Sequence, residues 1–217
     1  MEIRDVGVVG LGTMGAGIAE VFARAGVSVT AVEADPGALS RGMAILDGSL
    51  RKAVSRGRLT ENEYAEIAGR VSPAPAVASL GGADLVIEVV PELLAIKRQV
   101  IAELDEVLAP SAIIATNTSS LSVTTIAAGS ARPGRVVGMH FFNPAQVMRL
   151  VEVVTTVLTD LPVAAAVTAL AGRLGKTPVQ VTDRAGFVAN ALLLPYLNHA
   201  ARLFETGYAT RDRKSVV

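Results

Sequence analysis

The chain has 217 residues, of which 51% are hydrophobic, and its 20 basic residues balance its 20 acidic residues. This length accommodates one well-buried domain and part of a second, and the balanced charge gives no overall positive field for nucleic acid or an anionic membrane surface. Cysteine is absent from the sequence, which excludes disulfides and thiolate chemistry.

Short runs of Val and Ile alternate with longer amphipathic segments rich in Ala and Leu. This alternation is typical of parallel strands joined by crossover helices, and it predicts a doubly wound α/β fold with a mostly parallel sheet. The expected strands are Asp5 to Gly10, Ser28 to Glu33, Asp84 to Val89, Ala112 to Thr116, Val136 to Phe141, Leu150 to Val154 and Val179 to Val181.

A glycine motif, Gly-Leu-Gly-Thr-Met-Gly, lies between the first expected strand and an Ala-rich helix. In this setting Gly10 permits a tight turn, Gly12 leaves room for a pyrophosphate, and Gly15 lets helix and strand approach each other. The free N–H groups at the start of the helix would face the phosphates. The motif therefore predicts a dinucleotide site that also includes Thr13 and Met14, the alternative being a glycine turn that binds nothing.

Glu33 ends the second expected strand, about 20 residues after the motif, where a carboxylate can accept hydrogen bonds from the adenosine ribose. That carboxylate would repel a 2′-phosphate, and Ala34 follows it where a guanidinium could have stood. Together with the glycine motif, Glu33 predicts a Rossmann-type domain that binds NAD rather than NADP.

The crossover after Glu33 is expected to be long and helical. Asp35, followed by a proline, predicts the start of a helix that ends near Arg56. Residues 60–63 have the spacing of a capping box and predict a second, shorter helix. Pro73 and Pro75 are expected to mark a loop.

Polar residues follow two neighbouring strands at the carboxyl edge of the expected sheet, where such folds bind ligands. His140 lies at the end of one strand, and residues 117–120, Asn-Thr-Ser-Ser, follow the strand before it. We expect these side chains to lie close together. Taken singly, each has a structural alternative, because a lone histidine is often structural and Asn-Thr-Ser-Ser can cap the helix expected to begin near Val123.

Glu152 is an isolated carboxylate among buried apolar residues, and such a group needs a partner inside the protein. His140 is the available partner. Nothing in this set of polar residues requires a metal ion.

Four sequence blocks at these positions closely resemble the signature blocks of L-3-hydroxyacyl-CoA dehydrogenases. They are residues 117–121, 138–144, 150–154 and 186–190, and the resemblance extends from residue 6 to about residue 211. It implies oxidation of an L-3-hydroxyacyl-CoA to the 3-oxoacyl-CoA, and the reverse. His140 would remove the 3-hydroxyl proton while C3 gives its hydride to NAD, and Glu152 would orient the imidazole. Ser119 and Asn190 would hydrogen-bond the reacting oxygen.

The resemblance implies further contacts with the cofactor and the substrate. Glu92, Lys97, Ser119 and Asn143 would contact NAD, whereas Ser49 and Arg56, on the long crossover helix, would lie near the CoA moiety, with Ser119 and Asn190 at its reacting end. For Lys97 and Arg56 the alternative is a solvated helix face, because surface cations are common and need no function. His199 is assigned no role.

The pattern changes at Gly186 to a single helical run whose apolar face has no later partner in the chain. We therefore expect an NAD-binding domain over residues 1–184 and, over 185–211, the first helix of an incomplete all-α C-terminal domain. In the family this domain closes over the acyl chain and supplies a homodimer contact. Residues 212–217 do not resemble the family's continuation, and a coding sequence for them resembles a sequencing-library adapter, so we expect a non-native tail.

Neither a signal peptide nor a membrane span is expected. The N-terminus lacks a basic start and an apolar run, and the longest apolar stretch, Phe187 to Leu197, is shorter than the roughly 20 residues that span a bilayer. We expect a cytoplasmic protein.

Two alternatives to the full dehydrogenase remain open. One is an NAD-binding fragment with little turnover, because an apolar helix without a partner favours association with other proteins over a stable monomer. The other is a related dehydrogenase acting on a free hydroxy acid such as L-gulonate.

Overall fold

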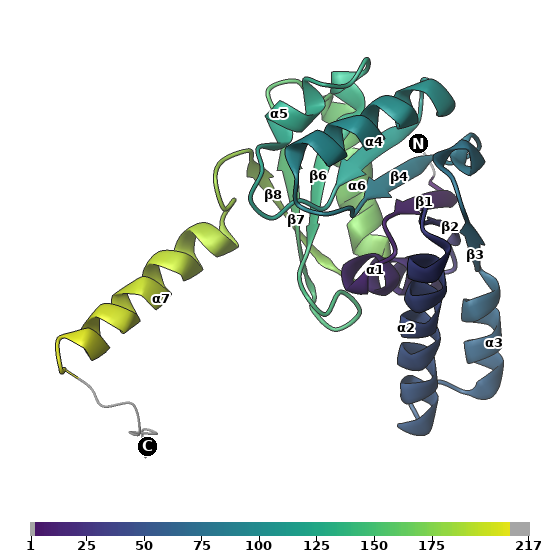
Figure 1. Ribbon diagram of the computed structural model, residues 1–217, viewed down its shortest axis with the longest axis horizontal. Helices are drawn as coiled ribbons and strands as arrows, with labels where there is room; N and C mark the ends of the chain where they lie inside the picture. The colour runs from purple at the N-terminus through teal and green to yellow at the C-terminus, as the bar shows by residue number, and fades with distance from the viewer. Residues whose placement is uncertain (1–2, 209–217) are drawn as a thin grey trace.

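The computed structural model describes residues 3–208 and contains one eight-stranded sheet in the order β3-β2-β1-β4-β5-β6-β7-β8 (Figure 1). The strands are β1 (Asp5–Val9), β2 (Ser28–Val32), β3 (Val71–Ala74), β4 (Leu85–Glu88), β5 (Ile113–Thr116), β6 (Val136–Phe141), β7 (Leu150–Thr155) and β8 (Thr177–Thr182). Neighbouring strands are parallel except β6 and β7, which are antiparallel. The predicted mostly parallel α/β sheet is confirmed.

The described residues also form helices, most of which cover the two faces of the sheet. They are α1 (Thr13–Arg24), α2 (Pro36–Ser55), α3 (Glu61–Gly69), α4 (Leu94–Val107), α5 (Val123–Ala127), α6 (Leu161–Arg173) and α7 (Ala189–Glu205), with short 3₁₀ turns at Val77–Leu80 and Pro133–Arg135. Side chains of α1 and α6 pack on one face of the sheet, and those of α4 and α5 pack on the other. The strands are therefore buried on both sides, which explains their continuous Val and Ile runs.

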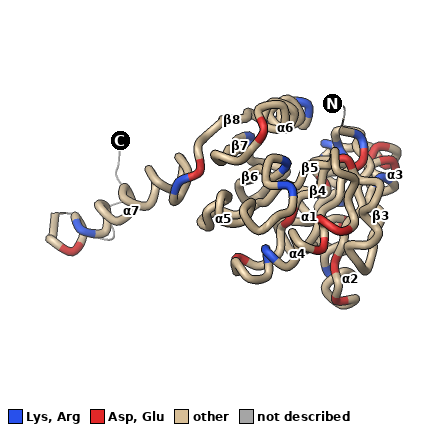
Figure 2. Tube along the Cα trace, turned by 90° about the horizontal axis from the view of Figure 1, so that it is seen from above, with Lys and Arg blue, Asp and Glu red and all other residues tan. Residues whose placement is uncertain are grey.

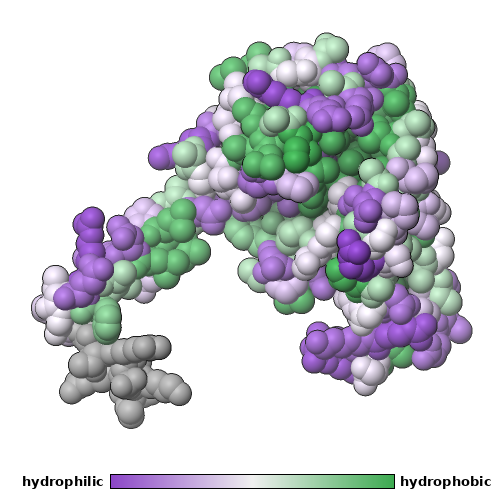
Figure 3. Space-filling model, in the orientation of Figure 1, coloured by the Kyte–Doolittle hydropathy of each residue, from purple (hydrophilic) through white to green (hydrophobic). Residues whose placement is uncertain are grey.

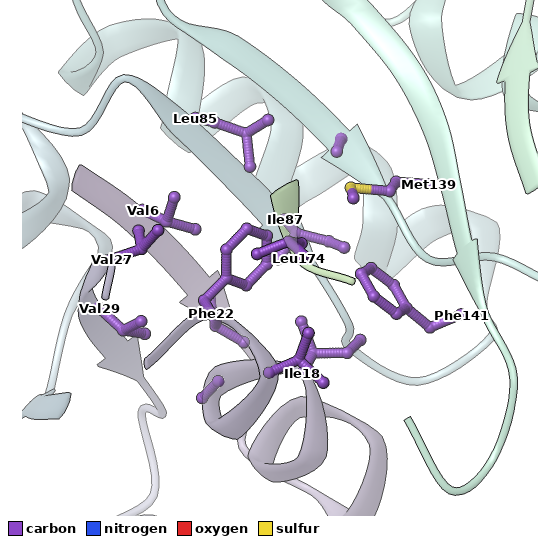
Figure 4. Close-up of a cluster of buried hydrophobic side chains, with 14 of the residues drawn as sticks. Val6, Ile18, Phe22, Val27, Val29, Leu85, Ile87, Met139, Phe141 and Leu174 are labelled. Atoms are coloured by element: carbon purple, nitrogen blue, oxygen red, sulfur yellow. The ribbon is translucent and has the colours of Figure 1, made fainter. Parts of the chain in front are cut away.

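The larger core cluster joins α1 to the middle of the sheet. Phe22 of α1 is fully buried and meets Phe141 of β6 edge-on, with ring centroids 6.5 Å apart. Ile18 lies on the same face of α1, and Ile87 of β4 belongs to the same cluster (Figure 4). This packing fixes α1, and with it the glycine turn that begins the helix, against the carboxyl half of the sheet.

The structure corrects the expected loop at Pro73. Val71–Ala74 forms the edge strand β3, in which Pro73 lies opposite Ala31 of β2. A proline is tolerated there because an edge strand has a ladder partner on one side only, so one row of N–H groups is not needed for pairing. The remaining expected strands lie within a few residues of the observed ones.

Helix caps follow the expected residues in the long crossover. Asp35 caps α2 by accepting a hydrogen bond from the Ala38 N–H at 2.6 Å. Thr60 and Glu63 form the complete capping box of α3, with each side chain bonded to the other residue's backbone N–H. The sequence therefore specifies both helix starts locally.

Helix α7 extends away from the body of the molecule (Figure 1), and the structure shows no buried residue along its length. A hydrophobic patch lies on it (Figure 3). The exposed apolar residues of this helix include Leu192, Leu194 and Tyr196, each more than 60% exposed. Basic and acidic residues are interspersed on α2, α3 and α7 (Figure 2). Within residues 3–208, none of the helices combines the length and the apolar character needed to cross a membrane.

Candidate functional site

The glycine turn joins β1 to α1 and leaves open space in front of the helix. Gly10 has a φ of +95°, and a Cβ added there would approach the Val89 carbonyl oxygen to 2.8 Å. A Cβ at Gly15 would overlap the Gly10 carbonyl oxygen, whereas one at Gly12 would meet no atom within 4 Å. Gly10 and Gly15 are therefore required by the fold, and Gly12 keeps the entrance to the helix clear.

A cleft of about 790 Å³ begins at this turn, a volume typical of cofactor sites. Gly12, Thr13 and Met14 line it, as do Glu33 and Ala34 from the end of β2. Residue Gly12 caps α1 without a side-chain hydrogen bond, so backbone N–H groups at the start of α1 face the cleft without competition from a capping side chain. Backbone donors and open space beside a carboxylate fit the pyrophosphate and adenosine ribose of NAD.

Glu33 is half-buried and is oriented by the turn itself. Its Oε2 accepts a hydrogen bond from the Leu11 N–H at 3.2 Å, and its Oε1 lies 3.5 Å from the Asp35 nitrogen. These backbone bonds hold the carboxylate at the rim of the cleft, where its remaining lone pairs can accept from hydroxyl groups.

A second cavity of about 320 Å³ adjoins the cleft at the carboxyl ends of β5 and β6. Met14, Val89 and Val90 line both spaces, so the two are neighbours. The predicted site residues Glu92, Ser119, His140, Asn143 and Asn190 all line this second cavity, together with Asn117, Phe141 and Phe142. The structure thus brings together the polar residues that the sequence places after separate strands.

His140 and Glu152 face each other across the antiparallel strands β6 and β7. The Nδ1 atom of His140 lies 2.8 Å from Glu152 Oε2, and both residues are at most 5% exposed. The other carboxylate oxygen accepts hydrogen bonds from the Val188 and Ala189 N–H groups, at 3.0 and 2.9 Å, where the chain enters α7. Glu152 is therefore fixed from two sides and leaves the imidazole Nε2 as the ring nitrogen available to a bound molecule.

Two phenylalanine rings flank the imidazole. The centroid of Phe142 lies 4.4 Å from that of His140, and the centroid of Phe187 lies 5.5 Å away. Phe187 is buried and has a φ of +49°, an uncommon conformation for a side chain of this size. Neither ring is predictable from the sequence, where a phenylalanine that contacts a histidine is not distinguishable from a core residue.

Glu92 organises the polar turn after β5. Its Oε1 accepts hydrogen bonds from the Thr118 hydroxyl at 2.6 Å, the Ser119 N–H at 2.9 Å and the Ser120 N–H at 3.1 Å. Partial burial raises the pKa of Glu92, but these hydrogen bonds and the charge of Lys97 outweigh it and lower the pKa to about 2. Glu92 is therefore a carboxylate at neutral pH.

The polar turn carries Ser119 and contacts the start of α7. The Asn190 side chain donates a hydrogen bond to the Ser119 carbonyl at 3.5 Å. Asn117 accepts one from the Phe141 N–H at 2.8 Å and so joins the end of β5 to the end of β6. The cap of α5 is Ser122, assisted by Asp183, so the helix start does not depend on residues 117–120.

Lys97 lies inside the protein, so the alternative of a solvated helix face is wrong for this residue. Its side chain is 1% exposed and its Nζ atom lies 2.8 Å from Glu88 Oε1 and 3.3 Å from Glu92 Oε2. Glu88, at the end of β4, is fully buried, and the sequence-based predictions do not include it. The signal was present, because Glu88 stands among apolar residues as Glu152 does.

The two residues expected near CoA occupy different surroundings on α2. Ser49 lines a small cavity of about 50 Å³ beside Asn143 and accepts a hydrogen bond from the Gln146 side chain at 3.3 Å. Arg56 is exposed at the end of α2, roughly two helical turns further along. Only Ser49 is close to the cofactor turn, since Thr13 lines the same small cavity.

No group of three or more His, Cys, Asp or Glu side chains suited to a metal ion occurs in the described part of the chain. The acid–base residues instead pair with each other and with backbone groups.

The sequence profile of the family "3-hydroxyacyl-CoA dehydrogenase, NAD binding domain" matches residues 5–184. The chain belongs to this family. It is similar over 210 residues, at 47% identity, to the 3-hydroxybutyryl-CoA dehydrogenase of Mycobacterium tuberculosis, a match that covers 96% of this chain and 73% of that protein. A probable 3-hydroxybutyryl-CoA dehydrogenase of Bacillus subtilis is 42% identical over 209 residues, with the same coverage.

Solved structures of this dehydrogenase family share the fold. The crystal structure of M. tuberculosis FadB2 matches with a TM-score of 0.95 and 46% identity, over 98% of this chain and 75% of that chain. (S)-3-hydroxybutyryl-CoA dehydrogenase PaaH1 from Ralstonia eutropha has the same TM-score at 38% identity, over 97% and 75%. The chain is therefore a 3-hydroxyacyl-CoA dehydrogenase-type oxidoreductase with NAD as cofactor, and it is shorter than these relatives.

Proposed function

We propose that this protein oxidises an L-3-hydroxyacyl-CoA to the 3-oxoacyl-CoA, and catalyses the reverse, by hydride transfer with the His140–Glu152 pair as general base. The observation that carries this proposal is the position of the pair. His140 lines a cavity that adjoins the cofactor cleft, and its Nδ1 is engaged by a fixed carboxylate.

The imidazole Nε2 would remove the proton of the substrate 3-hydroxyl as C3 loses its hydride. Glu152 holds Nδ1–H and so selects the tautomer whose Nε2 is a base, and its charge stabilises the imidazolium that forms. The rings of Phe142 and Phe187 restrict the imidazole's rotation. Ser119 and Asn190, which line the same cavity, would hydrogen-bond the reacting oxygen and hold C3 in place.

NAD supplies the hydride acceptor when it is bound. The N–H groups around Gly12 and Thr13 would hold its pyrophosphate, and Glu33 would accept from the adenosine ribose hydroxyls. The nicotinamide end would then reach the junction at Met14, where the cleft opens into the cavity of His140. Ser119, Asn143 and Glu92 line this cavity and are proposed contacts at that end, and Lys97 lies directly behind Glu92.

A CoA thioester is the proposed substrate because the similar relatives are named as dehydrogenases of 3-hydroxybutyryl-CoA. Ser49 and Arg56 are the proposed CoA contacts, and the guanidinium of Arg56 can bind a phosphate. A structure described as a diketoreductase also matches, at 31% identity and a TM-score of 0.91, so a substrate without CoA is the second candidate. The expected cytoplasmic location and homodimer stay predictions.

The decisive experiment measures oxidation of NADH in the presence of acetoacetyl-CoA, with free acetoacetate and L-gulonate plus NAD as comparison reactions. We expect turnover with the CoA thioester alone. Binding of NADH without turnover of any of these substrates would favour the NAD-binding fragment, and preferential turnover of a free acid would overturn the proposed substrate class.

A His140→Gln variant tests the proposed base. We expect kcat to fall by about 10²- to 10⁴-fold, the usual contribution of a general base, while the dissociation constant for NADH changes little. Glu152→Gln should lower kcat in the same direction and leave NADH binding intact. The matched control is His199→Gln, which removes an exposed imidazole from α7. An equal loss of NADH binding in the His140 variant would count against its assigned role.

A further inference from the structure

Glu88 and Lys97 form a buried ion pair between β4 and α4, with side chains 0% and 1% exposed. Each has further partners inside the protein. Glu88 Oε2 accepts a hydrogen bond from the Thr116 hydroxyl at 2.8 Å. Nζ of Lys97 lies within 3.3 Å of Glu88, Glu92 and the Val90 carbonyl oxygen, which matches the three donors of an ammonium group.

The pair holds Val90 by both of its backbone polar groups. Glu88 Oε1 accepts a hydrogen bond from the Val90 N–H at 2.8 Å, and Lys97 donates one to the Val90 carbonyl at 3.3 Å. Val89 and Val90 line both the cofactor cleft and the cavity of His140. The wall at the junction of the two spaces is therefore fixed by buried charges rather than by strand pairing alone.

The same pair extends to the polar turn that carries Ser119. Lys97 contacts Glu92 Oε2, and the other oxygen of Glu92 accepts hydrogen bonds from Thr118, Ser119 and Ser120. A chain of contacts thus runs from Glu88 through Lys97 and Glu92 to the residue proposed to bind the reacting oxygen.

We infer that Glu88 is a positioning residue: together with Lys97 it fixes the Val89–Val90 wall and the Glu92–Ser119 contact, and so shapes the site of the nicotinamide end of the cofactor. This inference rests on the proposed function in one respect, which is that the nicotinamide end of the cofactor binds beside His140. Both carboxylate oxygens of Glu88 already accept hydrogen bonds inside the protein, Oε1 from Val90 and Lys97 and Oε2 from Thr116. We therefore assign Glu88 no direct contact with the cofactor.

A buried ion pair is a strong constraint because removal of one partner leaves the other charged and unpaired in an apolar interior. Glu88→Gln and Lys97→Met keep the side-chain volume nearly constant and remove one charge each. If the two residues act as one unit, the double variant should lose no more than the worse single variant.

The test compares two probes, NADH and ADP, by equilibrium binding to the full chain. ADP lacks the nicotinamide end and, in the proposed binding mode, would contact only the glycine turn and the Glu33 end of the cleft. For Glu88→Gln and for Lys97→Met we expect NADH affinity to fall by about tenfold, a size of coupling found between contacting residues, and ADP affinity to fall by less than about twofold. Thr116→Val, which removes one donor to Glu88, should weaken NADH binding by a smaller factor and remain usable if the charge variants unfold.

Arg98→Met is the matched control, since it removes an exposed cation one position along α4 whose side chain donates to the Thr125 carbonyl. The inference is overturned if NADH and ADP affinities fall equally, if neither falls, or if the two single losses multiply in the double variant. These assays need no acyl-CoA, so failure of acetoacetyl-CoA turnover bears on the proposed function alone.

Discussion

Gly12 and Gly15 belong to one motif but are glycines for different reasons. A side chain at Gly15 would overlap the Gly10 carbonyl oxygen, whereas a side chain at Gly12 would point into open space. One position is constrained by the folded chain, and the other by the ligand that the chain is built to receive.

We therefore predict that an alanine substitution at Gly12 affects cofactor binding, whereas one at Gly15 affects stability. Gly12→Ala should leave the thermal unfolding midpoint within a degree or two and weaken NADH binding by at least about tenfold, because a methyl group would occupy the pyrophosphate space. Gly15→Ala should lower the free energy of unfolding by about 1–3 kcal/mol, the usual cost of overpacking. Thermal melts and NADH titrations distinguish the two, and a stable Gly12→Ala protein with native affinity would contradict the assignment of the cleft.

A residue of the site could be predicted from the sequence where a charged side chain stands within a run of apolar residues. Glu152 was identified as a buried carboxylate needing His140, and the 2.8 Å contact is present. Glu88 carries the same signal but lacks a nearby motif, so its partner Lys97, which comes from a different element, could not be paired with it from sequence. Phe187 is recognisable beside the imidazole only once the chain after β8 has been placed.

Among the secondary-structure elements, the central strands were easier to predict than the edge strand β3 and the cap of helix α5. Buried parallel strands have continuous Val and Ile runs, so β6 was predicted at its observed bounds, whereas β3 was missed because Pro73 is read as a strand breaker. Helix α5 shows a further limit of sequence. Its N-terminus is capped from sixty residues away by Asp183, which accepts hydrogen bonds from the Ser122 hydroxyl and the Val123 and Thr124 N–H groups.

This distant cap gives a pH-dependent prediction. Burial raises the pKa of Asp183, but hydrogen bonds from Thr124, Ser122 and Val123 outweigh it and lower the pKa below its ordinary value. The charged group thus contributes stability that is fully present above its unfolded pKa, about 3.9, and is lost as the pH falls through the lower folded value. At pH 7, Asp183→Asn should lower the free energy of unfolding by about 1 kcal/mol, because a neutral amide accepts weaker hydrogen bonds than a carboxylate does.

Urea unfolding at several pH values checks this cap. The difference between the native protein and Asp183→Asn should shrink as the pH falls below about 4, where the carboxyl of the unfolded chain becomes protonated, and should be lost below the lower pKa of the folded state. Glu106→Gln, at an exposed position of α4, is the control and should show no comparable difference at pH 7. A gap that stayed constant down to low pH would show that the charge of Asp183 does not contribute to the cap.

The whole molecule consists of a well-packed α/β body and one projecting helix. Leu192, Leu194 and Tyr196 on α7 are each more than 60% exposed, in contrast to the buried apolar residues of the body. Large exposed apolar surfaces favour association. The composition of this helix was readable from the sequence as an apolar face without a partner, but its projection from the body was not.

We predict concentration-dependent self-association through α7. In sedimentation velocity, Leu192→Gln/Tyr196→Gln should shift the protein toward smaller species, while the thermal unfolding midpoint stays nearly unchanged because these side chains are exposed. Glu205→Gln, an exposed polar change on the same helix, should leave the association unaltered. Unchanged sedimentation of the double variant would exclude this face as the site of association.

The antiparallel pairing of β6 and β7 has a consequence for protein engineering. His140 and Glu152 are direct cross-strand neighbours, so the ladder sets their separation, not the length of the connection over residues 142–149. A longer connection would leave the His140–Glu152 pair intact as long as β6 and β7 pair in the same register. Deleting Val151 from β7 with the preceding register kept would instead turn the side chains that follow it, including the Glu152 carboxylate, to the opposite face of the sheet.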